Sequence, residues 1–247
     1  DEFLAFNKKY YVPNNAVLTI AGDLDIVQTK KWVKDYFGEI PRGKEIKRNF
    51  PREPLINQTI KAEAFDPNIQ IPAIFLAYRT PKRNSREARV LDMISTYLSG
   101  GKSSKLFKKL VDEKKMSLEV SAFNMSNEDY STYVIISLPI GATKLETLTK
   151  EISEEVDKIQ TELISEKDFQ KLQNQFESSF VSSNATIEGI ANSLAEYYTF
   201  YGDTDLINKE LDLYKSITRE EIKSVAQLYL KTNQRLELHY LPESKKE

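Results

Sequence analysis

The side chains best suited to acid–base or metal chemistry are scarce in this sequence. It holds a single histidine, His239, and no cysteine. A zinc site of the usual kind needs two or more histidine or cysteine ligands, and a Ser-His-Asp triad would have to use His239. This histidine falls on the polar face of the last predicted strand, where an ordinary exposed histidine is the simpler interpretation. The sequence therefore predicts no catalytic residue and no metal ligand within the chain.

Three other groups of residues suggest chemistry, and each has a simpler structural interpretation. Gly101-Lys102-Ser103 resembles the end of a phosphate-binding loop, but it follows a predicted helix where such a loop follows a strand. The acidic residues from Glu151 to Glu155 lie on a lysine-rich helix, which is typical of a solvated face. The aromatic residues from Tyr197 to Tyr201 have helical spacing, which favours packing, although a recognition surface is a second interpretation.

The overall composition narrows the class of protein. The chain has 247 residues, 40% of them hydrophobic, and 35 basic against 37 acidic residues give a net charge of −2. These values are typical of a folded globular protein, and the balanced charge argues against nucleic acid as a partner. No apolar run approaches the ~20 residues of a membrane-spanning helix, and we expect neither a membrane span nor a leader. The absence of cysteine fits a reducing or an oxidising compartment, so periplasm and cytoplasm both stay open for a bacterial protein.

The first 43 residues are predicted to be an incomplete piece of a domain. Their pattern indicates a helix over residues 1–11, a buried strand over 15–21 and a helix from Asp25 to Gly38. A lone strand cannot satisfy its own backbone, so this strand needs a sheet that the segment does not contain. We infer that the chain starts inside a domain. Residues 44–57, rich in proline and charge, are predicted to be a linker.

The remaining residues, 58–247, are predicted to form one α+β domain. Strands are predicted in pairs, at 60–64 with 71–80 and at 117–122 with 130–138, and a last strand covers 236–240. Helices are predicted over residues 85–98, 103–114, 143–159, 165–201 with a kink at 182–184, and 218–230. Strands grouped in pairs and helices grouped in blocks favour a mostly antiparallel sheet packed against helices.

Capping residues mark where several of these helices begin. Asp25 and Ser85 are predicted to cap their helices, and Thr218 with Glu221 has the spacing of a capping box. Thr143 with Glu146 has the same spacing, so a second box is predicted there.

The motifs add a family resemblance. The segment FNKKYYVPNNAVLTIAGDLD, followed by WVKDYFGEIPRG, resembles the end of the first domain of zinc peptidases of the M16 family, which includes insulinase, pitrilysin and mitochondrial processing peptidase. The segment LSGGKSSKLFKKLVDEKKMSLEVSAF is similar to the family's second domain. The resemblance implies that residues 1–43 are the tail of a preceding zinc-site domain and that 58–247 are the M16-like C-terminal domain.

The family's zinc site is an H-x-x-E-H motif, in which two histidines bind the metal and the glutamate is the general base, plus a distant glutamate ligand. None of this motif is present here, so the resemblance implies that zinc is bound upstream, in the parent protein and outside this chain. Second domains of the family sometimes carry an arginine and a tyrosine that contact substrate. Their positions fall on Val111 and Leu118, which do not match.

Three functions remain open. The favoured one is the supporting half of a zinc endopeptidase that encloses peptides or unfolded segments. Its implied partners are the missing upstream zinc domain, a second M16-like subunit in a homo- or heterodimer, and a peptide substrate. The first alternative is a non-catalytic structural or partner subunit of the same fold. The second is a free-standing binding module that uses the surface from Tyr197 to Tyr201.

Overall fold

The computed structural model describes residues 1–47, 50–51, 54 and 56–243. The predicted linker at 44–57 lies partly outside these residues. The chain forms two compact units, one of residues 1–53 with 178–210 and the other of residues 54–177 with 211–247.

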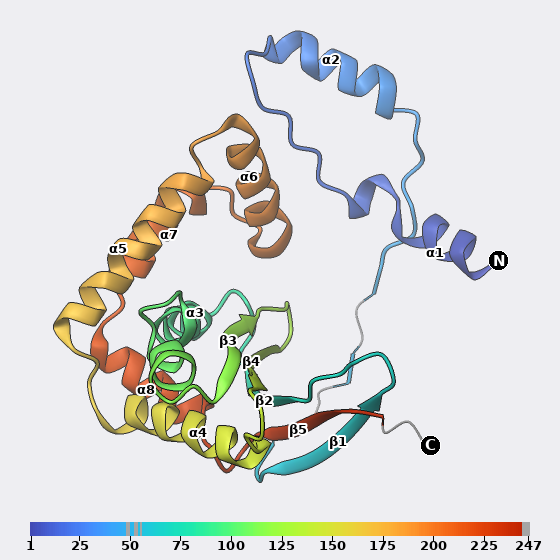
Figure 1. Cartoon of the computed structure of the whole chain (residues 1–247). Helices are drawn as coiled ribbons and strands as arrows, with labels where there is room; N and C mark the ends of the chain where they lie inside the picture. Colours follow the sequence, from blue (N-terminus) through green and yellow to red (C-terminus); the bar gives the residue numbers. More distant parts are fainter. Residues whose placement is uncertain (48–49, 52–53, 55, 244–247) are drawn as a thin grey trace. The chain divides into compact units, whose positions relative to one another are not determined.

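The second unit is built on one sheet of five strands (Figure 1). The strands are β1 (Ile60–Asp66), β2 (Ala73–Thr80), β3 (Ser117–Met125), β4 (Ser131–Pro139) and β5 (Leu236–Pro242). Their order across the sheet is β1-β5-β2-β4-β3. Only the β1–β5 pair is parallel, and the other three pairs are antiparallel. The prediction of an α+β fold with a mostly antiparallel sheet is confirmed.

Helices cover one face of this sheet. The helices of the chain after β2 are α3 (Arg86–Ser99), the π-helix η2 (Phe107–Glu113), α4 (Leu145–Thr161), α5 (Glu166–Ser183), α6 (Ile187–Tyr201), α7 (Leu206–Lys215) and α8 (Arg219–Tyr229). Of these, α3, α4 and α8 contact the strands and bury the side chains of one face, including Leu76 and Tyr78 of β2 and Ile135 of β4. The helix predicted over 143–159 is confirmed as α4, and its apolar residues are buried from Leu145 to Ile159. All residues of the buried core cluster belong to the second unit.

The polar face of the last strand, β5, lies toward the helices, although the sequence predicted that it would be exposed. Leu238 pairs with Phe75, and His239 pairs with Ile74, which is fully buried beneath the helices. Directly opposed residues share a face, so the polar residues of β5 face the helix layer and the apolar ones face away from it. His239 is half-buried rather than exposed, which corrects the sequence-based expectation.

The first unit buries almost nothing within itself. It contains α1 (Glu2–Tyr10), the short 3-10 turn η1 (Pro13–Asn15), α2 (Ile26–Phe37) and α6, and none of these elements has a buried residue. Large side chains are exposed throughout, with Phe3 at 78% and Val27 at 80%. In α6, the large side chains of Ile187 and Tyr198 are also exposed.

The strand predicted at residues 15–21 is not a strand in the structure. This segment is described throughout, and it forms no strand pairing and has no buried residue. Ala16 has extended backbone angles, so the conformation is that of a strand without a neighbour. The prediction of a buried strand is wrong for this chain because strand burial needs a partner sheet, and the first unit supplies none within its described residues.

The predicted caps give a mixed result. Asp25, Ser85 and Thr218 each accept a hydrogen bond from the backbone of their helix, and Thr218 with Glu221 makes both bonds of a capping box. The box predicted at Thr143 is wrong, because α4 begins at Leu145 with Lys144 as its N-cap and no side-chain cap.

Candidate functional site

The phosphate-loop resemblance is resolved as a turn between two helices. Gly101 has a φ of +90°, a conformation that favours glycine, and its carbonyl accepts a hydrogen bond from the backbone of Ser104 at 3.0 Å. The preceding element is α3 rather than a strand, so the interpretation as a glycine break is confirmed.

The acidic residues of α4 form an ion cluster rather than a solvated face, which corrects the sequence interpretation. The Lys109 ammonium lies 2.9 Å from carboxylate oxygens of Glu151 and Glu154 and 3.1 Å from one of Glu155. The Lys109 side chain is only 14% exposed. Although burial alone would lower it, hydrogen bonds to these three carboxylates raise the pKa of Lys109. The hydrogen bond from Lys114, together with Lys109, lowers the pKa of Glu151. These ion pairs hold the π-helix against α4.

A polar hollow of about 380 Å³ lies beside this cluster. It could not be predicted from the sequence, because the residues that line it are far apart in the chain. Lys105 lies 2.9 Å from Asp168 and 5.2 Å from the centre of the Tyr97 ring. Burial raises the pKa of Tyr97. Within the hollow, Lys105 pairs with Asp168 of α5, while Lys158 pairs with Glu155 of its own helix, α4, so both lysines already have a carboxylate partner.

The residues at the family's arginine and tyrosine positions lie on neighbouring elements. Val111 lies in the π-helix and packs against the buried core. Leu118 lies at the start of β3, where the pairing register with β4 shifts between Ser117 and Glu119, and it is 47% exposed. A bulge at this position turns a side chain outward, but leucine offers no charge and no hydrogen bond there.

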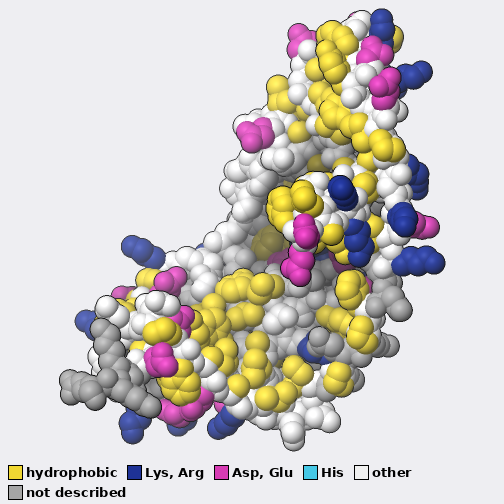
Figure 2. All heavy atoms as spheres, turned by 90° about the vertical axis from the view of Figure 1, so that its right-hand side faces the viewer, with side chains coloured by type: hydrophobic (Ala, Val, Ile, Leu, Met, Phe, Trp, Pro, Cys, Tyr) yellow, Lys and Arg dark blue, Asp and Glu magenta, His cyan; other side chains and the backbone are white. Residues whose placement is uncertain are grey.

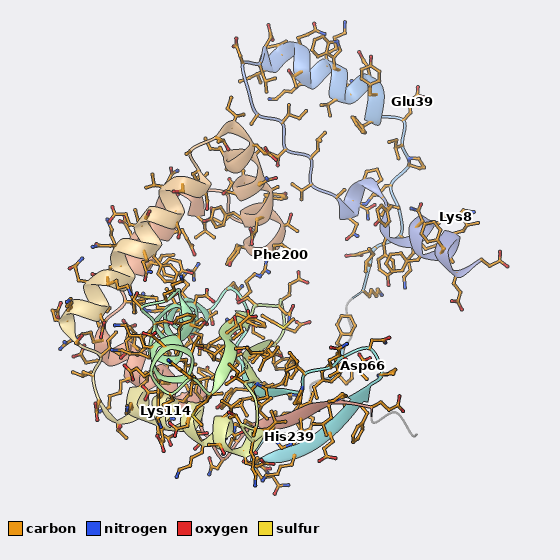
Figure 3. The ribbon with its side chains drawn as sticks, viewed as in Figure 1. Lys8, Glu39, Asp66, Lys114, Phe200 and His239 are labelled. Carbon is orange, nitrogen blue, oxygen red and sulfur yellow. The ribbon has the colours of Figure 1, made fainter. Side chains whose placement is uncertain are left out.

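The structure gathers no metal-binding group from the residues it describes. Among them, no three or more His, Cys, Asp or Glu side chains are arranged to hold a metal ion. His239 lies between Glu63 of β1 and Ile74 of β2 (Figure 3). In the same part of the chain, no helix is both long and apolar enough to cross a membrane.

The aromatic group of α6 is partly exposed. Tyr198 and Phe200 are exposed, and Tyr197 makes an edge contact with Tyr201 at 5.9 Å between ring centres. Figure 3 marks Phe200 near the end of this helix.

The face of the sheet opposite the helices is a further candidate surface, in the second unit. It carries Phe75 and Ala77 of β2, Ile136 of β4, and Leu238 and Tyr240 of β5, and all are half-buried. The Phe75 and Tyr240 rings meet edge to face at 6.0 Å. Figure 2 shows hydrophobic side chains gathered across the lower body on the side where Figure 1 places the sheet. An apolar sheet face of this kind can contact an extended peptide or another protein.

Comparisons with known proteins agree with this architecture. The chain is 27% identical to the zinc protease PqqE of Helicobacter pylori over 234 residues, which cover 93% of this chain and 52% of PqqE. A crystal structure of a protease from Helicobacter pylori superposes with a TM-score of 0.87 at 24% identity, covering 96% of this chain and 57% of that one. A peptidase M16 inactive domain from Pseudomonas fluorescens gives a TM-score of 0.80 at 16% identity, covering 100% of this chain and 58% of that one.

The chain spans about half the length of the curated relatives it matches most fully. Several of these relatives are named zinc proteases. The model of the family described as the peptidase M16 inactive domain matches residues 1–176. Because that match takes in most of the 247 residues, the chain belongs to the family of peptidase M16 inactive domains.

Proposed function

We propose that this chain is the supporting half of a zinc-dependent endopeptidase subunit, which helps to enclose peptides or unfolded segments. The observation that carries the proposal is the one-sided sheet. Helices bury one face, while the other face carries half-buried apolar residues that include Phe75, Ile136 and Leu238. Such a surface suits the wall of a chamber for extended chains, whose apolar side chains it can contact without a fixed sequence.

The proposal assigns residues 1–43 to the tail of a preceding domain, 44–57 to a linker and 58–247 to the M16-like domain. Two observations support this division. The apolar side chains of α1 and α2 are exposed, and the segment after η1 is extended without a paired strand. Both are expected of a piece cut from a larger core, and the curated relatives are about twice as long as the matched region.

Zinc, which the relatives' names imply, does not fit the residues of this chain. The only histidine lies on the interior strand β5, paired with Glu63 on one side and Ile74 on the other, and the sequence has no second histidine and no cysteine. In the proposal, zinc is bound by the missing upstream domain. Val111 and Leu118 lack the groups that would reach a substrate, so a second M16-like subunit would supply them.

Metal analysis of the whole parent protein tests the proposal. We expect about one zinc ion per parent chain and none in residues 1–247 purified alongside as the blank. We also expect chelator-sensitive peptide hydrolysis by the parent with its partner subunit, and none by this chain alone.

Two outcomes would contradict the proposal. A parent that holds no zinc after a loading control would favour the non-catalytic structural subunit. Peptide hydrolysis by residues 1–247 alone, abolished by a chelator, would show that the metal site lies within this chain.

A further inference from the structure

The outer edge of β3 is one end of the sheet, and an edge strand is a place where another strand can add. In an antiparallel pair, the backbone groups of alternate residues point away from the partner strand. At such an edge these groups offer a ready template for an extended peptide or a second copy of the chain.

A serine hydroxyl occupies the middle of this edge. The Ala122 backbone N–H donates to Ser99 Oγ at 2.7 Å. The single Ser99 hydroxyl proton has two acceptors in reach, the Ala122 carbonyl at 3.1 Å and the Ser95 carbonyl of its own helix at 3.3 Å. An incoming antiparallel strand would bond to the same two backbone groups of Ala122, its N–H and its carbonyl. The Ser99 hydroxyl therefore takes the place of a neighbouring strand at Ala122.

Ser99 is held in this position by a firmly packed helix. It is the last residue of α3, one position after the fully buried Leu98. The next residue, Gly100, approaches the α3 backbone so closely that an added Cβ would lie 2.5 Å from the Thr96 carbonyl oxygen. The helix α3 also packs against β3, which keeps Ser99 beside the edge of the sheet.

We propose that Ser99 closes the outer edge of β3 to strand addition, so that this half of the protein does not bind an extended peptide at that edge. This inference concerns hydrogen bonding at Ala122 and holds whether or not the parent is a zinc peptidase.

Amide hydrogen exchange of the whole chain, resolved by residue with NMR, tests the proposal. We expect Ser99→Ala to raise the exchange rate of the Ala122 amide about tenfold or more, because its hydrogen-bond acceptor is lost. Ser99→Thr keeps a hydroxyl and is expected to keep the protection. Thr96→Val is the matched control, since the Thr96 hydroxyl lies one turn earlier and bonds only to Asp92 of its own helix.

A peptide of alternating threonine and valine serves as the probe for strand addition. We expect it to leave the exchange of the Val120, Ala122 and Asn124 amides of the wild-type chain unchanged. Protection of these amides by the peptide in the wild-type chain would overturn the proposal. Equal Ala122 exchange rates in the wild-type and Ser99→Ala chains would also overturn it.

Discussion

At the residue scale, charged side chains buried beneath the helices explain why the polar side of β5 packs against the helix layer. Arg235 is 3% exposed, and it donates to Tyr78 Oη and Ser153 Oγ at 2.9 Å and to Glu237 at 2.6 Å. These bonds make it favourable to bury the polar side of β5. Alternation along 235–240 could be predicted from the sequence. The side of β5 that faces the helices could not be predicted, because Tyr78 and Ser153, which accept hydrogen bonds from Arg235, come from distant parts of the chain.

The first prediction concerns Lys109. Replacing Lys109 by methionine keeps the length of the side chain but leaves Glu151 and Glu155 largely buried without their shared cation. We expect Lys109→Met to lower the free energy of unfolding by roughly 3 kcal/mol, as for the loss of one partner of a buried ion pair. Urea unfolding followed by circular dichroism measures the change. Lys108→Met is the control, because Lys108 is exposed, and it should change stability little.

The effect of Lys109→Met should depend on pH with a definite sign. The bonds from Lys114 and Lys109 lower the pKa of Glu151, so the carboxylate stabilises the folded chain above its unfolded pKa of about 4.3. That stability is lost as the pH falls through the lower folded pKa. The difference in the free energy of unfolding between the wild-type and Lys109→Met chains should therefore become smaller below about pH 4. If this difference in the free energy of unfolding stays constant from neutral to acid pH, the loss of stability in Lys109→Met is caused by packing and not by charge.

At the element scale, two threonines with the same spacing to a glutamate provide a matched comparison. Thr218 Oγ1 accepts from the Glu221 backbone at 3.1 Å, while Thr143 lies one residue before the N-cap of α4 and makes no cap. We expect Thr218→Ala to lower the free energy of unfolding by about 1 kcal/mol and Thr143→Ala to change it by less than about 0.3 kcal/mol. Thermal or urea unfolding of both variants checks this. Equal losses would mean that capping is not what separates the two sites.

Most elements were predictable because their signals are local. The alternation of β1 and the buried stripe of α4 follow directly from side-chain periods of two and of about 3.6. The π-helix was not predictable as such, since residues 107–113 have the same apolar spacing as an ordinary helical turn. The predicted strand at 15–21 shows the opposite failure, because a strand needs a neighbouring strand and the described residues of the first unit supply none.

At the scale of the whole molecule, the sequence pointed to the family more strongly than to a site. The lack of a second histidine and of any cysteine limited the metal and catalytic sites that could be predicted. The motif around Pro13 and Gly22 pointed to the end of a domain. The open sheet face was not foreseen. It depends on which side α3, α4 and α8 cover, and that is fixed by tertiary packing rather than by any one segment.

The last prediction follows from the distribution of the core between the two units. Every residue of the buried core cluster lies between Ile74 and Leu230, and α1 and α2 bury none of their side chains. Deleting residues 1–43 removes exposed apolar surface without opening a cavity, so the urea midpoint of the remaining chain should stay unchanged. Binding of a hydrophobic dye should fall, because Phe3, Val27 and their neighbours are gone. Urea unfolding and dye fluorescence of both chains measure the two effects, and a lower midpoint for the shortened chain would show that residues 1–43 stabilise the M16-like domain directly.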